Sequence, residues 1–178
     1  DVSIHRAVHT SIALALISGF ALGAAILAFS RGLLELMGCP ENVIEGAALY
    51  LKIYAAGLPA SMIYNFGAAI LRAVGDTRRP LYFLTVSGIV NIILNILLVA
   101  GLKLSVAGVA IATVASEVLS CVLVLLCLIH SHDAIRYEPK KTRIYKKSLS
   151  MILRIGLPAG LQSSMFSISN VLIQSAIN

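Results

Sequence analysis

Long apolar stretches separated by short charged segments dominate the pattern of this chain. Five of these stretches are long enough for a membrane-spanning helix, which needs about 20 apolar residues. They cover residues 7–30, 44–71, 80–102, 104–129 and 149–178. The second is interrupted near its start by Glu45 and Lys52, and the fourth contains Glu117. The pattern therefore predicts an all-α fold, a polytopic bundle of transmembrane helices.

The composition supports a membrane protein over a soluble one. Of the 178 residues, 58% are hydrophobic and 12% are charged, whereas about 25% of a soluble domain is charged. A soluble fold of this size would lack the polar surface that it needs, and an apolar chain of this kind does not stay disordered. The three cysteines show no C-x-x-C spacing and indicate packing residues.

The basic residues concentrate in alternate loops and set the orientation of the spans. Three Arg lie in residues 72–79 and six Lys or Arg in 130–147, whereas 31–43 and 101–105 have one each. Because cytoplasmic loops are rich in Lys and Arg, both basic loops are predicted to be cytoplasmic, in a multi-pass protein of the plasma membrane. No aromatic-studded basic face accompanies the charge, so the expected partner is the lipid bilayer and not nucleic acid.

Glycine and proline mark turns, bends and close contacts. Between the second and third spans, Gly75 suits a left-handed helix C-cap, Asp76 or Thr77 an N-cap, and Pro80 the first turn of the next helix. Pro59 and Pro158 lie inside spans, where each frees a backbone carbonyl, and we expect them to act as hinges. The glycine pairs 19/23 and 156/160 have the spacing of close helix packing.

Polar side chains inside the spans carry the candidate chemistry, because such groups face the bundle or a cavity. Asn91 and Asn95 lie one turn apart, and two carboxamide oxygens offer hard ligands for a small cation. Glu117 is the only carboxylate well inside a predicted span, and a bound proton or cation would offset the cost of burying its charge. In the second and fifth spans, similar stripes give candidate cavity-lining residues: Asn65, Ser163, Ser167, Asn170 and Gln174.

The alternative is structural. The same amides and hydroxyls can hydrogen-bond between helices as packing contacts, and Glu117 can be a neutral, hydrogen-bonded acid. No catalytic motif competes, since the chain has no GxSxG, HExxH or phosphate-cradling glycine loop. The histidines lie at span ends, and the pair of His130 and His132 in a charged loop is more usually solvated than a metal site. We therefore predict no enzyme, no metal site and no cofactor apart from a coupling ion.

Four segments together resemble the multidrug and toxic compound extrusion (MATE) transporters. They are YAAGLP at 54–59, LRAVGDTRRP at 71–80, NIILNILLV at 91–99 and VAGVAIAT at 106–113. The resemblance implies twelve spans in two six-helix lobes, of which this chain covers about the third to the seventh. Residues 1–130 would belong to the N-terminal lobe, 131–148 to the cytoplasmic inter-lobe loop, and 149–178 to the first span of the C-terminal lobe.

The resemblance also implies an activity and a site. The activity is secondary active antiport, in which small cationic amphipathic drugs and toxic compounds are exported in exchange for Na⁺ or H⁺. The full-length protein is expected to be a monomer. Asn91, Asn95 and Thr113 match the first-lobe cation site of such transporters, although some of them carry Asp where this chain has Asn95. Glu117 joins this set as a candidate coupling residue.

Two alternatives remain at the level of sequence. One is a lipid-linked oligosaccharide flippase of the same broader superfamily, which often lines its cavity with Arg or Lys. The other is a non-transport structural membrane protein. The interiors of the spans are nearly free of basic residues, which favours the antiporter over the flippase.

Overall fold

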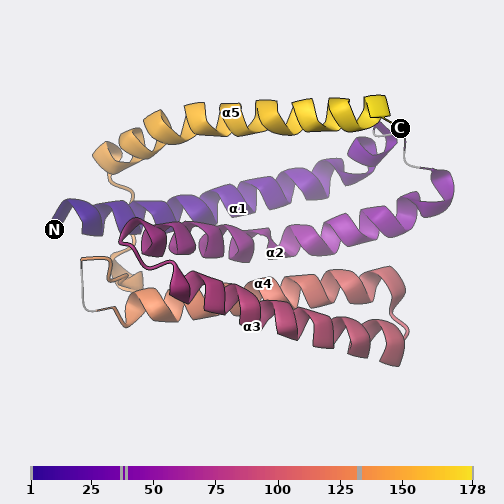
Figure 1. Cartoon of the computed structure of the whole chain (residues 1–178), viewed down its shortest axis with the longest axis horizontal. Helices are drawn as coiled ribbons and strands as arrows, with labels where there is room; N and C mark the ends of the chain where they lie inside the picture. The colour runs from indigo at the N-terminus through magenta and orange to yellow at the C-terminus, as the bar shows by residue number, and fades with distance from the viewer. Residues whose placement is uncertain (1, 37, 39, 132–133, 178) are drawn as a thin grey trace.

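The chain folds into long helices joined by short turns. The computed structural model describes residues 2–36, 38, 40–131 and 134–177, without the side chains of 2, 36 and 171–177. The long helices are α1 (Val2–Leu36), α2 (Glu41–Ala73), α3 (Arg78–Asn95), α4 (Ser105–Ile129) and α5 (Lys146–Ile177) (Figure 1). A π-helical segment, Ile96–Gly101, extends α3, and a short 3₁₀ turn, Pro139–Lys141, precedes α5. The predicted all-α fold is confirmed.

Four helices in the described part of the chain are long and apolar enough to cross a membrane. They are Ser3–Glu35, Glu41–Ala73, Arg78–Gly101 and Ser105–Ile129. These segments enclose or closely match the first four predicted spans. The predicted fifth span falls on α5, which is helical but is not among these four.

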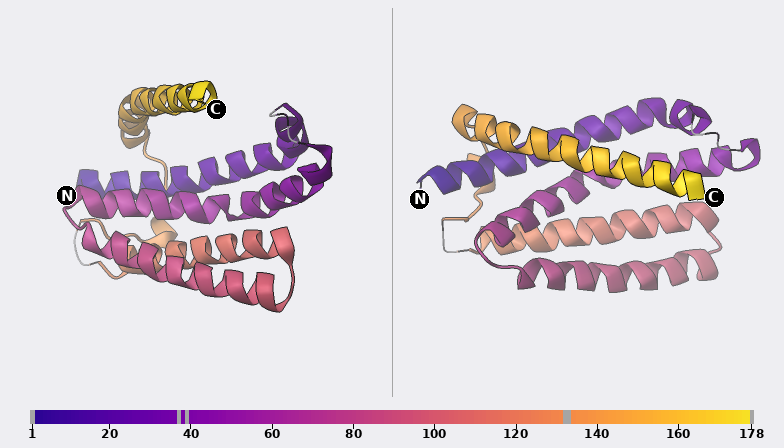
Figure 2. Two further views of the ribbon diagram at one scale, coloured as in Figure 1. Left: turned by 45° about the vertical axis from the view of Figure 1, so that its right-hand side comes forward. Right: turned by 45° about the horizontal axis from the view of Figure 1, so that its top comes forward.

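The helices pack in an order that differs from their order in the chain. α1 packs along α2, α2 along α4, and α4 along α3, while α5 makes its main contact with α1. The views in Figures 1 and 2 agree with this arrangement, with α5 beside α1 at one side and the α3–α4 pair at the other. α2 and α3 both rest on α4 but scarcely touch each other. α4 therefore packs against both α2 and α3 and separates them.

Small residues allow a close crossing of α1 and α2. A methyl group on Gly19 would lie 2.5 Å from Cα of Pro59, and one on Gly23 would lie 2.8 Å from the carbonyl oxygen of Ala55. Pro59 has no N–H to donate to Ala55, so the freed carbonyl faces α1. The predicted close packing is confirmed for this pair. A methyl group on Gly156 or Gly160 would meet no described atom within 4 Å.

The turn between α2 and α3 has the predicted capping geometry. Gly75 has a φ of 87°, and the N–H groups of Gly75 and Asp76 donate to the carbonyls of Arg72 and Leu71, each at 3.0 Å. These two bonds form a Schellman motif, which satisfies the last carbonyls of α2. Oδ1 of Asp76 then accepts a hydrogen bond from the N–H of Arg79 at 3.1 Å. The tight helical hairpin is thus capped on both sides.

A buried histidine on α1 holds the loop that connects α4 to α5. His9 is 1% exposed, and its Nδ1 lies 2.8 Å from the carbonyl oxygen of His5, which can only accept. Nδ1 therefore carries the proton, an assignment from hydrogen bonding. Nε2 lies 3.2 Å from both the carbonyl oxygen and the backbone nitrogen of Glu138, and with the proton on Nδ1 it accepts the N–H. The loop backbone is thus tied to the start of α1.

A second hydrogen-bonded contact between α1 and this loop involves the next residue of α1, Thr10. The hydroxyl of Thr10 donates to the carbonyl of Arg6 at 2.8 Å and accepts the N–H of Tyr145 at 3.1 Å. Just before Glu138 in the loop, the side chains of Ile135 and Tyr137 are buried in the core of the bundle. The basic loop consequently runs against the helix ends.

We expect His9→Ala to release this loop. The substitution removes a buried acceptor and leaves the Glu138 N–H without it, a cost of about 1–3 kcal/mol. Trypsin cleavage after Lys140 and Lys141, timed on the folded protein, should then become about tenfold faster. His130→Ala is the matched control, because the His130 ring is bonded to Leu126 of its own helix. Equal cleavage of both variants would contradict the role given to His9.

Candidate functional site

A polar groove lies over α4 between α2 and α3. Its volume is about 370 Å³, and it lies near the midpoints of α3 and α4. α2 lines it with Ser61, Tyr64 and Asn65, α3 with Leu84, Ser87, Gly88 and Asn91, and α4 with Ser116, Glu117 and Ser120. Three helices thus direct polar groups into one space at a depth where such groups are costly to place against lipid.

A continuous chain of hydrogen bonds leads from α3 to α4 along this groove. Nδ2 of Asn95 donates to the backbone oxygen and to Oδ1 of Asn91, at 2.9 and 3.0 Å. Nδ2 of Asn91 donates to the hydroxyl of Ser116 at 3.2 Å, and that hydroxyl donates to the carbonyl of Thr113 at 2.7 Å. The two predicted amides therefore act as one unit that is anchored on α4.

Thr113 joins this chain through its backbone. Its hydroxyl donates to the carbonyl of Val109, one turn earlier in the same helix, at 2.9 Å. Ser116, which the sequence analysis did not single out, instead supplies the side chain that meets Asn91. Its position three residues after Thr113 and next to Glu117 is the signal that could have identified it.

A second serine pair connects the same two helices. The hydroxyls of Ser87 and Ser120 form a hydrogen bond across the interface, and both side chains are buried. Ser87 was also missed from the sequence. It lies four residues before Asn91 and eight before Asn95, so a strict i, i+4 register would have placed it on the same helix face.

The carboxyl group of Glu117 lies between α4 and α2. Its Oε2 is buried and has no hydrogen-bond partner among the described residues. A methyl group on Gly57 would lie 2.8 Å from this oxygen, so only the absence of a side chain there leaves room for it. Tyr54 and Ser61 of α2 lie beside the carboxyl. Glu117 therefore lines the groove, while its unpaired Oε2 is buried against α2.

The remaining predicted residues divide between this groove and α5. Asn65 lines the groove, is exposed, and donates from Nδ2 to the carbonyl of Ser61 at 2.9 Å. Pro59 is half-buried at the crossing of α1 and α2. The structure thus brings Asn65 together with Asn91 and Glu117, with Asn95 and Thr113 adjoining them.

The α5 candidates lie away from the groove. Ser163, Ser167 and Asn170 are exposed, and the hydroxyl of Ser167 donates to the carbonyl of Ser163 at 3.1 Å. Pro158 is exposed within the same helix. The side chain of Gln174 lies outside the described residues. Among the described residues of α5, Ser163, Ser167, Asn170 and Pro158 do not line the groove that Glu117 lines.

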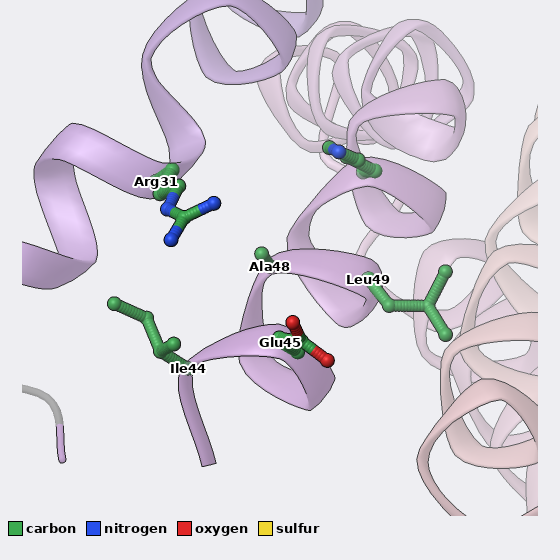
Figure 3. A pocket seen from close by; sticks show the side chains of 6 residues that line it. Arg31, Ile44, Glu45, Ala48 and Leu49 are labelled. Atoms are coloured by element: carbon green, nitrogen blue, oxygen red, sulfur yellow. The ribbon is translucent and has the colours of Figure 1, made fainter. Parts of the chain in front are cut away.

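A smaller hollow lies between α1 and α2, away from the groove. It has a volume of about 250 Å³ and is lined by Arg31, Ile44, Glu45, Ala48, Leu49 and Lys52. Arg31 extends from α1 toward α2 (Figure 3), and its Nε pairs with Glu35 at 3.2 Å. None of the predicted site residues whose side chains the structure describes lines this hollow.

Apolar helices of membrane-spanning length around a polar groove define a multi-pass helical membrane protein. Comparison with known proteins specifies the class further. Residues 2–97 match the MatE family, and this match covers more than half of the chain. The chain therefore belongs to the MatE family, as the resemblance of its sequence predicts.

Individual relatives agree with this membership. The chain is 31% identical to the probable multidrug resistance protein YoeA of Bacillus subtilis, over 96% of this chain and 38% of YoeA. It is 26% identical to the multidrug export protein MepA of Staphylococcus aureus, over 87% of this chain and 35% of MepA. The chain thus spans well under half the length of these relatives.

A solved structure shows the same fold. The crystal structure of a MATE in the bent conformation superposes with a TM-score of 0.81 at 24% identity, covering 93% of this chain and 42% of the other. The helix arrangement described above is therefore the arrangement of this part of a MATE fold.

Proposed function

We propose that the full-length protein is a secondary active transporter that exports cationic amphipathic compounds in exchange for Na⁺ or H⁺. The observation that carries the proposal is the groove, which lies near the midpoints of two apolar helices and is lined by amides, hydroxyls and the carboxylate residue Glu117. Polar groups at that depth are characteristic of transport pathways. The names of YoeA, a probable multidrug resistance protein, and MepA, a multidrug export protein, support the export of drugs.

In this proposal the Asn91–Asn95 pair binds the coupling ion. Their amide oxygens, the hydroxyl of Ser116 and the carbonyl of Thr113 are hard oxygen ligands of the kind that small cations prefer. An ion that recruits these oxygens competes with the hydrogen bond from Asn95 to Asn91 within α3 and with the bond from Asn91 to Ser116 of α4. Ion binding would therefore favour a different arrangement of the two helices, which is the coupling that an antiporter needs.

We further propose the topology that the charge pattern predicts. The loops 72–79 and 130–147 face the cytoplasm, residues 1–130 belong to one lobe, and α5 begins the second lobe. The bonds from His9 and Thr10 to the 130–147 loop support the placement of the start of α1 on the same side. The main contact of α5 is with α1, away from the groove, which supports its assignment to another lobe.

The lining of the groove favours the antiporter over the flippase. A pyrophosphate-linked substrate needs cationic side chains in its path, and no Lys, Arg or His lines the groove in the described part of the chain. The groove offers a carboxylate, which suits a cation.

Proteoliposomes of the full-length protein test the proposed function. Loaded with a cationic dye, they should show dye efflux under an imposed sodium gradient or an imposed proton gradient. The efflux should stop when an ionophore dissipates the driving gradient. Absence of efflux under both gradients, with folding confirmed by size-exclusion chromatography, would contradict the proposal.

A further inference from the structure

We propose that Tyr145 is the pivot about which α5, and with it the second lobe, turns during transport. Thr10 and Arg6 of α1 position this pivot on the first lobe. The inference rests on the proposed function, in which α5 begins the second lobe. It gives positioning roles to three residues that do not line the groove.

Two contacts hold Tyr145 on α1. Its N–H donates to the hydroxyl oxygen of Thr10 at 3.1 Å. The guanidinium carbon of Arg6 lies 5.4 Å from the centroid of its ring, within the range of a cation–π contact. Thr10 is 0% exposed, and its hydroxyl donates to the carbonyl of Arg6 at 2.8 Å, so the oxygen that meets Tyr145 is held in one orientation. The backbone and the ring of Tyr145 are therefore both fixed to α1.

The loop that leads to Tyr145 is fixed as well. The N–H of Glu138 is bonded to His9 of α1, and the hydroxyls of Tyr137 and Thr142 form a hydrogen bond at 2.7 Å. Tyr137 is itself buried in the core of the bundle. Backbone that is held by buried groups at several points does not open readily. The loop is therefore expected to move with the first lobe as far as Tyr145.

Beyond this point, α5 is in contact with the first lobe only at its beginning in the described part of the chain. The carbonyl of Tyr145 accepts the N–H of Leu149 at 2.9 Å, which begins the helix. Ser148, Leu149 and Ile152 are half-buried, whereas every residue from 153 to 170 is exposed. Figure 2 shows α5 standing away from α3 and α4. The change from fixed to free chain therefore occurs within two turns after Tyr145.

A pivot at this point converts a small rotation into a large displacement. α5 has 32 residues, so it is about 48 Å long, and a rotation of about 10° at its start moves its far end by about 8 Å. Hinges of domain motions are a few loop or helix-terminal residues that take up the change in backbone torsions. Tyr145, the residue before α5, has such a position.

Pro158 is the other point at which α5 could turn, because it frees a backbone carbonyl inside the helix. The two hinges differ in one measurable respect. A rotation at Tyr145 moves all of α5, whereas a bend at Pro158 moves only the part that follows it. Residues 153–157, which precede Pro158, are already exposed, and this favours Tyr145.

Distances between spin labels in the full-length protein in nanodiscs test the pivot. One label is placed by Leu102→Cys on the exposed turn before α4, in a background without other reactive cysteines. Its partner is placed on α5 either before Pro158, by Ile155→Cys, or after it, by Gln162→Cys.

Thr10→Val removes the acceptor of the Tyr145 N–H and should broaden the distance distributions of both label pairs. Thr10→Ser keeps the hydroxyl and should restore both to the wild-type form. A control pair within the first lobe, Leu102→Cys with Gly32→Cys, should not change, because both positions are exposed and lie before the loop. Broadening of the Gln162 pair alone would place the hinge at Pro158 and overturn the inference, as would unchanged distributions for both pairs.

Initial rates of dye efflux from proteoliposomes give a second readout. Tyr145→Ala and Thr10→Val should lower the rate by about fivefold or more, since hinge positions set the rate of conformational steps. Tyr145→Phe keeps the ring that Arg6 covers and should transport at the wild-type rate. Thr85→Val, which removes a threonine hydroxyl bonded within α3, is the matched control and should do the same.

The outcomes separate this inference from the proposed function. Normal efflux by both Tyr145→Ala and Thr10→Val would overturn the pivot, even where the wild-type protein is an active transporter. If Tyr145→Ala does not fold, as judged by size-exclusion chromatography, the near-isosteric Thr10→Val and its Ser counterpart decide the question. Failure of the wild-type protein to transport would contradict the proposed function, while the label distances would still test the pivot.

Discussion

Gly19→Val is expected to destabilise the protein more than any other single substitution considered for this chain. A Cβ at this position would lie 2.5 Å from Cα of Pro59 and 3.0 Å from its nitrogen, and both atoms belong to the backbone of α2. Backbone cannot move aside as a flexible side chain does, so α1 and α2 have to separate along the crossing. We expect a loss of about 3 kcal/mol or more, the upper end of overpacking costs. The loss of stability is measured by thermal unfolding of the full-length protein in detergent, monitored by size-exclusion chromatography.

The matched control is Gly32→Val, on the same helix. A Cβ there meets no described atom within 4 Å, so the substitution changes helix propensity without a clash. Its melting temperature should stay close to that of the wild type. If Gly19→Val and Gly32→Val have the same melting temperature, the close crossing of α1 and α2 is not present in the folded protein.

Asn91→Ala is expected to reduce gradient-driven efflux by about tenfold or more while the protein stays folded. Asn91 is the centre of the amide chain, because it accepts from Asn95 and donates to Ser116. Its loss removes an amide oxygen from the proposed ion site and the side-chain link between α3 and α4. A single interhelical hydrogen bond in a membrane contributes only about 0.6 kcal/mol on average, so stability should change little. Initial rates of dye efflux from proteoliposomes give the comparison.

Thr85→Val provides the control on the same helix. The Thr85 side chain is exposed and its hydroxyl donates to the carbonyl of Leu81 in the same helix, at 2.9 Å. This variant should transport at the wild-type rate. Normal efflux by Asn91→Ala, at equal amounts of reconstituted protein, would rule out the assignment of the amide pair to ion coupling.

Much of the architecture could be predicted from local patterns. The apolar windows predicted the four helices of membrane-spanning length, and Gly75, Asp76 and Pro80 predicted the hairpin between α2 and α3. The shared face of Asn91 and Asn95 also followed from their spacing. These features depend on residues within a few turns of one another, which is why the sequence alone suffices.

Other features of the site could not be predicted in this way. Ser116, rather than the hydroxyl of Thr113, meets Asn91, because the rotation of α4 against α3 decides which side chain faces the amide. The stripe on α5 looked equivalent to the others but lies away from the groove. The sequence placed His9 at the end of a span, and only the structure shows that it is buried and hydrogen-bonded to a loop far along the chain.

The sequence by itself determined that this chain is a multi-pass helical membrane protein, where its helices lie, and which family it resembles. Hydrophobic transfer and backbone geometry act locally, so both can be read from consecutive residues. Only the tertiary structure decided that α4 lies beneath α2 and α3 and that Glu117 meets the backbone at Gly57. Such contacts depend on how the side chains of one helix pack against the small residues of another. The residues involved are distant in the chain, so their packing cannot be read from neighbouring positions.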